Sequence, residues 1–223
     1  MRKYLLFIVC LSAVALSATA QTYEEEKKQQ KDSAIYQGTY LKLDLFNPVF
    51  EAARSKGGIQ DYELCINIRL KQRFYPTLEL GSAQAQDSAD GGHYDGRGGF
   101  LRAGLDFNGL RKHPESPHAL LVGLRIGTSY QGYNLTGVIQ NSSYWEMPPV
   151  DYTHLRHADA WGEIVIGCQV QIAKGFHMGW DARFKLLFTR NDKNGGPLPY
   201  YIPGYGYRSD TNWGFHYYIG WKF

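Results

Sequence analysis

The sequence has few cysteines and no second long apolar run behind the one at its start. Only three of the 223 residues are cysteine, and the first of them, Cys10, lies in that initial run. After Gln21 no stretch approaches the roughly 18–20 consecutive apolar residues of a membrane helix. If the chain crosses a membrane, it must therefore do so as a closed barrel, the other way to satisfy every backbone group in lipid.

An excess of charge of either sign is also lacking. The 24 basic and 21 acidic residues give a net charge of +3, and no run of Lys or Arg forms a stripe. This balance excludes nucleic acid as an expected partner. In contrast, aromatic residues reach 15% and there are 25 glycines, a combination typical of an all-β protein with many turns.

The first twenty residues predict a secretory signal peptide. Arg2 and Lys3 form a basic start, residues 5–16 are apolar, and Ala18-Thr19-Ala20 fits the small-x-small cleavage rule. Lipid attachment at Cys10 is the alternative, although the residues before it are not small. We expect residues 1–20 to be removed and the mature chain to be exported.

The mature chain divides into a linker and a strand-rich domain. Residues 21–39 are polar and mixed in charge, which predicts a periplasmic linker. From Tyr40 to Phe223 apolar side chains recur at every second position, the signature of strands with two different faces. Eight such segments are 41–45, 62–71, 74–80, 101–107, 120–130, 163–172, 176–188 and 213–223. Cys65 and Cys168 fall on different faces of distant segments, so we expect two free thiols.

The connections between these segments alternate in length. Residues 47–60, 82–98, 131–157 and 189–212 are long, and the connections between them are shorter. Outer-membrane barrels combine short periplasmic turns with long outer loops. Their apolar face also carries aromatic girdles at both membrane interfaces. The rings expected in the two girdles are Phe74, Phe107, Phe176 and Phe223 at one level and Tyr62, Tyr130, Phe188 and Trp213 at the other.

The polar face of the predicted strands is rich in charges of both signs. An eight-stranded barrel is only wide enough for side chains to fill it, and buried charges need partners. We therefore predict a network of ion pairs that closes the interior, with an ion path as the functional alternative. Its members are Lys42, Asp44, Glu63, Arg69, Glu79, Arg102, Asp106, Arg125, Glu163, Asp181, Arg183, Lys185 and Lys222.

The last segment resembles the terminal signal that the bacterial barrel-assembly machinery reads. Its signal residues are Trp213, Phe215, Tyr217, Ile219, Trp221 and Phe223. The chain further resembles an uncharacterised family of small outer-membrane β-barrels from Bacteroidetes-type bacteria. The segments that carry this resemblance are Ile35-Tyr36-Gln37-Gly38, residues 73–81, Met178-Gly179-Trp180 and residues 201–206. The resemblance implies fold and location, and it supplies no catalytic residue.

The final long loop is the most suggestive surface for a ligand. Tyr-rich, rigid loops suit glycan or protein binding, although the same composition suits a lid over the barrel mouth. The candidate residues are Tyr200, Tyr201, Pro203, Tyr205 and Tyr207. Asp32-Ser33-Ala34 and Asp87-Ser88-Ala89 resemble short O-glycosylation sites.

These observations predict an all-β, eight-stranded, antiparallel, up-and-down transmembrane β-barrel with a filled polar lumen in the bacterial outer membrane. We expect a non-enzymatic structural or surface-binding protein that displays four long outer loops. Its expected partners are outer-membrane lipids, the assembly machinery and a glycan or protein ligand, with no cofactor and no metal. The alternatives are a lipid-modifying hydrolase at the outer rim, with Ser129 and His157 as its imaginable pair, and a narrow channel.

Overall fold

The computed structural model describes residues 35–45, 58–71, 73–89, 92–110, 116–138, 150–189 and 197–223. Across these ranges no helix is long and apolar enough to span a membrane. The predicted signal peptide and residues 21–34 of the predicted linker lie outside the described residues, as does Asp32-Ser33-Ala34. The rest of the predicted linker is mostly strand, because the first strand already begins at Tyr36.

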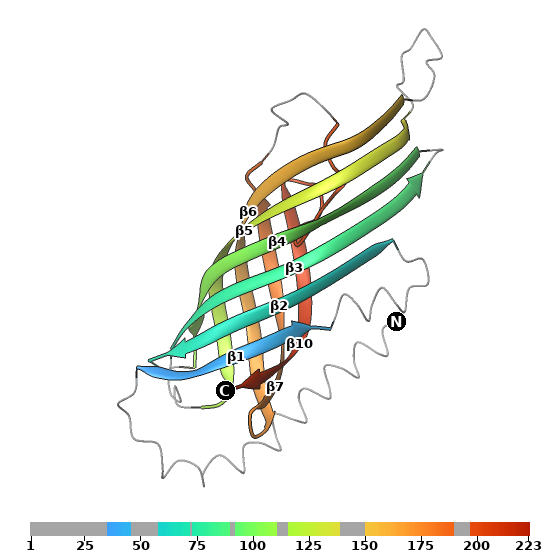
Figure 1. The fold of residues 1–223 in the computed structure, drawn as a ribbon. Coiled ribbons are helices and arrows are strands. Elements are labelled where there is room, and N and C mark those ends of the chain that lie inside the picture. The colour runs from blue at the N-terminus through green and yellow to red at the C-terminus, as the bar shows by residue number, and fades with distance from the viewer. Residues whose placement is uncertain are drawn as a thin grey trace, which may run out of the picture.

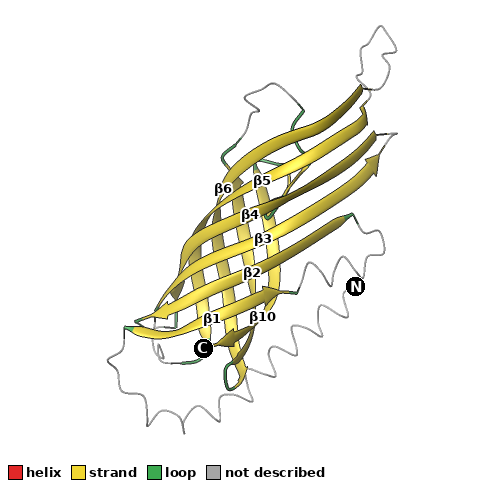
Figure 2. Ribbon diagram, in the orientation of Figure 1, coloured by secondary structure: helices red, strands yellow, loops and turns green. Residues whose placement is uncertain are grey.

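Eight long strands form one antiparallel sheet that closes on itself into a ring (Figures 1 and 2). Around the ring their order is β1-β10-β7-β6-β5-β4-β3-β2, so neighbours in the chain are neighbours in the ring. The strands are β1 (Tyr36–Asp44), β2 (Ile59–Leu70), β3 (Phe74–Ala89), β4 (Gly92–Asn108), β5 (Ala119–Val138), β6 (Val150–Ala173), β7 (Phe176–Leu187) and β10 (Thr211–Lys222). The predicted all-β antiparallel architecture with eight strands is confirmed.

The first and last strands close the ring. Leu43 of β1 lies opposite Ile219 of β10. At the end of this seam the backbone N–H of Phe223 donates to the carbonyl of Thr39 at 2.8 Å, and the N–H of Thr39 donates back at 3.1 Å. The last residue of the chain thus helps to join the two terminal strands.

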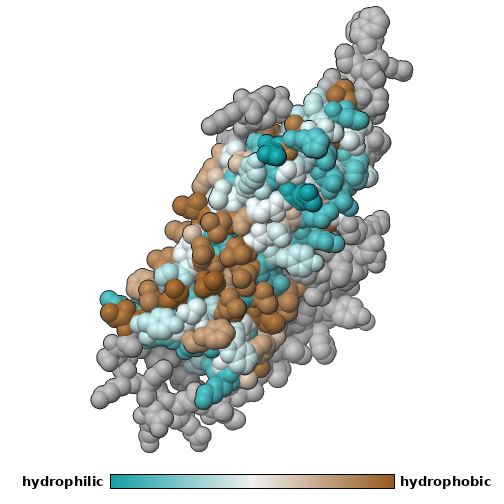
Figure 3. Space-filling model, viewed as in Figure 1, coloured by the Kyte–Doolittle hydropathy of each residue, from teal (hydrophilic) through white to brown (hydrophobic). Residues whose placement is uncertain are grey.

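The two faces of the sheet have opposite character. On β5, Leu124 and Ile126 are 67% and 69% exposed on the outside, whereas Arg125 between them is 5% exposed on the inside. This alternation follows from the two-residue period of a strand. Figure 3 shows the outer apolar side chains as a brown band across the lower part of the strands. The charged face therefore lies inside the ring and the apolar face lies outside.

The two ends of the ring differ. At the turn end, which carries Leu70, Phe74 and Phe223, tight connections join β2 to β3 and β6 to β7. Lys71 (φ 46°) and Gly175 (φ 80°) occupy these turns in the left-handed region. At the loop end, which carries Asp44, Ile59 and Leu187, the strands continue further than the sequence predicted.

Two of the predicted long loops are mostly strand. β3 runs to Ala89 and β4 starts at Gly92, while β5 runs to Val138 and β6 starts at Val150. The expectation of loops over 82–98 and 131–157 was therefore wrong. In residues 82–98, small, polar and glycine residues alternate with few large apolar ones, so the outer face lacks the apolar contrast on which the strand prediction relied.

These extra strand residues build a sheet that extends beyond the ring on one side. The last pair between β2 and β3 joins Ile59 to Ala85, and the last pair between β7 and β6 joins Leu187 to Trp161. Beyond those pairs the four strands β3 to β6 pair only with each other, and Figure 1 shows them projecting past their neighbours. We call this part, together with the adjoining residues 82–85 of β3 and 96–99 of β4, the outer sheet.

Candidate functional site

Three arginines and five carboxylates meet inside the ring. Each arginine bridges strands that are far apart in sequence, so that β2, β3, β4, β5, β6 and β7 all contribute a member. We call this set the interior network, and its members are Arg102, Arg125, Arg183, Glu63, Glu79, Asp106, Glu163 and Asp181.

Arg102 lies at its centre and has no exposed surface. Its guanidinium contacts Glu63, lies 3.1 Å from Glu79 through Nε, and lies 3.3 Å from Glu163 through Nη1. Arg183 also contacts these three carboxylates, with its Nη1 2.8 Å from Glu79 Oε2. Shared partners of this kind make the charges interdependent, because removing one leaves several opposite charges uncompensated.

Arg125 completes the network from β5. It contacts Glu79, and its Nη2 donates to Asp106 Oδ2 at 2.9 Å. Thr77 donates to the same Asp106 oxygen at 3.2 Å. Glu79, which is 1% exposed, therefore contacts all three arginines and is the most highly shared acid of the set.

Glycines on the inner face leave the room that these side chains occupy. A β-carbon at Gly123 would collide with the carboxylate of Asp106, and one at Gly104 would collide with the side chain of Arg125. Gly127 likewise faces the ring system of Trp161, which has no exposed surface. On the inner face, large side chains therefore occupy the space that the glycines leave free.

The other predicted interior residues lie around the network. Lys42 is buried with its ammonium 4.4 Å from the centre of the Tyr218 ring, and Asp44 accepts from His216 Nδ1 at 3.0 Å. Nearer the turn end, Arg69 lies over Tyr75 and half-buried Lys222 over Tyr40. Sequence reasoning left Asp61 and His216 out of the network, although both are buried inside the ring.

A cavity of about 20 Å³ remains beside the network, room for about one water molecule. Asp44, Glu63 and His216 line it, and their ligand-type atoms lie within 4.8 Å of one another. Chemically this is a set that could hold a cation. However, both oxygens of Glu63 already contact Arg102 or Arg183, and His216 already binds Asp44. We therefore assign the cluster to the ion-pair network.

A segment of the last connection closes the ring interior at the loop end. Residues 197–210, which we call the plug segment, carry β8 (Tyr201–Ile202) and β9 (Gly206–Tyr207), two short strands paired with each other. Ile202 and Tyr205 are 0% and 1% exposed and pack on the inward side chains Phe100, Trp161 and Leu187. The Lys185 ammonium donates to the carbonyls of Gly204 at 2.7 Å and Tyr205 at 3.2 Å.

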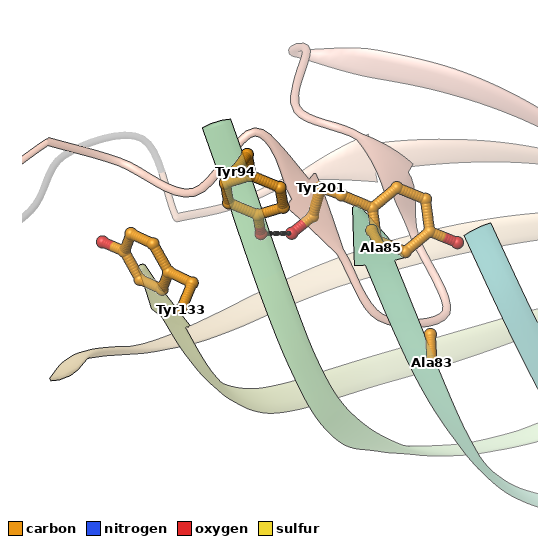
Figure 4. Close-up of a cluster of buried hydrophobic side chains, with 5 residues drawn as sticks. All are labelled: Ala83, Ala85, Tyr94, Tyr133 and Tyr201. Carbon is orange, nitrogen blue, oxygen red and sulfur yellow. Dashed lines mark hydrogen bonds between the residues drawn. The ribbon is translucent and has the colours of Figure 1, made fainter. Parts of the chain in front are cut away.

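The plug segment also packs against the outer sheet. Tyr201 lies with Tyr94 and Tyr133 over Ala83 and Ala85, and the Tyr94 hydroxyl donates to the Tyr201 carbonyl at 3.2 Å (Figure 4). Burial raises the pKa of the Tyr201 phenol well above its usual value. The phenol therefore stays neutral, as an apolar contact requires.

This packing buries some of the candidate ligand-binding residues of the last loop and leaves others exposed. Tyr201, Pro203 and Tyr205 are buried, whereas Tyr200 and Tyr207 are each 50% exposed. The two exposed rings meet edge to face with centroids 5.2 Å apart. Of the five residues predicted for ligand binding, the structure leaves only Tyr200 and Tyr207 facing outward.

The pair imagined for a lipid hydrolase points into the ring. Ser129 and His157 are 3% and 8% exposed on the inner face, and the Ser129 hydroxyl makes no hydrogen bond with a described residue. His157 Nε2 lies 3.3 Å from Asp159, whose carboxylate also binds Arg208. A lipid beside the outer face would not reach this serine.

Cys65 and Cys168 are free thiols, with Cys65 buried inside the ring and Cys168 half-buried. The residues of the predicted assembly signal lie on the outer face of β10 and directly after it, where Trp213 is 74% and Phe223 is 72% exposed. Asp87 and Ser88 lie at the tip of the β3–β4 hairpin and are exposed.

Fold and interior together define an all-β antiparallel protein whose single sheet closes as a ring of eight strands around buried ion pairs. A family model described as a domain of unknown function, DUF6048, matches residues 1–222, and the chain belongs to this family. No curated protein matches the chain. The predicted membership in an uncharacterised family is thus confirmed.

Proposed function

We propose that this protein is a closed, non-enzymatic β-barrel of the outer membrane of a Bacteroidetes-type bacterium, which anchors the outer sheet at the cell surface. The observation that carries the proposal is the continuous apolar exterior of the ring. Monomeric soluble proteins rarely expose contiguous apolar patches of more than a few hundred Å². Here every long strand contributes exposed apolar side chains, and Figure 3 shows them as a band on the face in view.

Aromatic side chains at both edges of this band support a bilayer as its environment. At the turn end, the Phe74 and Phe107 rings meet with centroids 5.7 Å apart, and Phe223 lies exposed directly after β10. At the loop end, Tyr130 and Trp213 are 59% and 74% exposed. The predicted signal peptide agrees with this location, because it would deliver the mature chain across the inner membrane.

The filled interior favours a structural or surface-binding role over conduction. The interior network occupies the space between the strands, and the plug segment covers its loop end. What remains available to a partner is the outer sheet with Tyr200 and Tyr207. We propose that a glycan or a protein binds there.

An arginine placed on the apolar band tests the membrane proposal. In a transmembrane barrel, Ile126→Arg should lower the free energy of unfolding in lipid vesicles by about 2–4 kcal/mol, since it puts a charge near the bilayer midplane. Gln84→Arg, on the exposed outer sheet, is the matched control and should change it by less than about 0.5 kcal/mol. Urea titration of protein refolded into phosphocholine vesicles measures both.

The proposal further requires that the mature protein fractionates with outer membranes and migrates faster on a gel before boiling than after it. A soluble monomer, recovered without detergent and indifferent to Ile126→Arg, would overturn the proposal.

A further inference from the structure

Two arginines flank a glycine on the outer face of the outer sheet. Arg97 of β4 is the register partner of Gly132 of β5, and Gly132 is the partner of Arg156 of β6. The three residues therefore form one row across neighbouring strands. Since strands lie 4.7–4.9 Å apart, the arginine α-carbons are roughly 9–10 Å apart, a span that two long side chains can close around a small group.

The row is open and its charges are unused. Arg97 and Arg156 are both exposed, and neither makes an ion pair or a hydrogen bond with a described residue. A β-carbon at Gly132 would meet only the Leu155 carbonyl, at 3.8 Å. The glycine thus leaves a recess, floored by backbone, in the row between the two arginine positions.

The row lies at the boundary of the apolar band. One rung nearer the ring, on the same face, Tyr130 is paired with Gly99 and Ala158. Tyr130 belongs to the aromatic edge of the band, and beyond this edge Figure 3 shows the surface of the outer sheet turning from brown to teal. In a membrane this is the depth at which lipid headgroups lie.

The acidic and titratable groups near the row leave the arginines available. One rung further out lies Asp95, to which Gln86 donates at 3.3 Å. In the same rung Asn134 accepts from the backbone of His154, an exposed residue. Asp95 is the one carboxylate of β4 on this stretch of the outer face, so the row keeps a net positive charge.

We propose that Arg97, Gly132 and Arg156 form a binding site for the phosphate of a lipid headgroup in the outer leaflet. Arginine suits this ligand because its planar fork donates two parallel hydrogen bonds to phosphate oxygens. The recess at Gly132 admits the phosphate between the forks, and Tyr130 contacts the apolar part of the same lipid. This site rests on the proposed membrane location and adds a chemical class of ligand to it.

The test uses the mature protein in phosphocholine nanodiscs, with binding measured by native mass spectrometry. The probes are a diphosphorylated glycolipid of the lipid A type, the same lipid without its phosphates, and inorganic pyrophosphate in solution. Binding of the phosphorylated lipid over the dephosphorylated one should fall at least tenfold in Arg97→Ala/Arg156→Ala. Pyrophosphate alone should bind weakly, because the acyl chains contribute to affinity.

Gly132→Glu is the sharper variant. The backbone at Gly132 is not left-handed and a β-carbon there has space, so the variant should fold. The carboxylate of the new glutamate would, however, neutralise the two arginines from within the recess. We expect the same loss of binding. Arg73→Ala, an exposed arginine at the turn end, is the control and should bind like the wild type.

The outcomes separate this site from the membrane proposal. If the wild type and all variants enter nanodiscs but bind both lipids equally, the phosphate site is wrong and the barrel stands. If pyrophosphate binds as tightly as the phosphorylated lipid, the site recognises free phosphate and the lipid assignment is wrong. If the wild type does not enter nanodiscs at all, the membrane proposal itself fails.

Discussion

Arg208 grips Asp159 through both carboxylate oxygens, with its Nη2 2.7 Å from Oδ1 and 2.8 Å from Oδ2. Asp159 is 1% exposed and lies on the inner face of β6. The same guanidinium donates through Nε to the Pro199 carbonyl at 3.0 Å. The Arg208 side chain therefore connects residues near both ends of the plug segment with strand β6.

Removing this tie should release the plug segment. In Arg208→Met the buried Asp159 loses its partner, and breaking a buried pair commonly costs about 3–5 kcal/mol. We expect limited proteolysis within residues 197–210 to accelerate at least tenfold while the ring stays folded. Adding Asp159→Asn removes the stranded charge and should restore part of the protection. An unchanged cleavage rate in Arg208→Met would show that apolar packing alone holds the segment.

Arg102→Met should destabilise the ring strongly, because it leaves Glu63, Glu79 and Glu163 facing each other without their central cation. The expected loss is about 3–5 kcal/mol in the free energy of unfolding, measured by urea titration in lipid or detergent. Arg73→Met, at an exposed position, should cost less than about 0.5 kcal/mol. Equal stability of the two variants would mean that water, not carboxylates, solvates Arg102.

The purified protein should show no steady conductance in planar bilayers. Ion pairs fill an interior that is only side chains wide, and the described residues leave a cavity for about one water molecule. Lys185→Met, which removes both bonds to the Gly204 and Tyr205 carbonyls, should loosen the plug segment without opening a pore, because the interior network remains below it. A large, stable wild-type current would contradict a closed interior.

Loss of Phe223 should impair assembly. Deletion removes both backbone hydrogen bonds to Thr39 at the seam, whereas Phe223→Ala keeps these bonds and removes only the exposed ring. If the assembly machinery recognises the phenyl group of Phe223, we expect low levels of both variants in the outer membrane. If the hydrogen bonds at the seam matter instead, we expect low levels of the deletion variant alone. Wild-type levels for both would refute an assembly role for this residue.

We expect the stability of the folded protein to depend on pH through His118, which lies at the turn end. Its Nδ1 accepts from the Gln171 backbone at 3.2 Å, and burial lowers its pKa below 6.5. The unfolded chain therefore binds the proton more readily, and stability should decline as pH falls from about 6.5 toward the folded-state pKa. Thermal melts at pH 7.5 and 5 should differ less for His118→Asn than for the wild type. An identical pH response in both proteins would place the effect elsewhere.

Strand faces were predictable from the sequence because the apolar exterior and the ion-paired interior impose opposite demands on neighbouring residues. Leu124, Arg125 and Ile126 show the pattern directly, and it holds wherever the outer face is strongly apolar. On β3 beyond Gly81, Ala83 and Ala85 alternate with Gln84 and Gln86, so neither face of this stretch carries a large apolar side chain. The period-two signal fades there, and residues 82–98 were read as a loop although residues 82–89 of β3 pair with residues 92–99 of β4.

The members of the interior network were predictable, but their partners were not. Alternation places Arg102 and Glu163 on one face, whereas their contact depends on the curvature and register of a sheet that closes only through β1 and β10. The plug segment was harder still, since burial of Tyr205 against Trp161 joins a connection to a strand face far away in sequence. Its composition allowed both a lid and a binding surface.

The fit between inner glycines and large side chains restricts how this family can diverge. At Gly127, any larger residue needs a simultaneous reduction at Trp161, because the nearest atoms to a β-carbon there all belong to the Trp161 side chain. Single changes at such pairs should be eliminated by selection, while compensated double changes survive. Across related chains these positions should therefore vary in concert, and the exposed apolar positions of the same strands should vary independently.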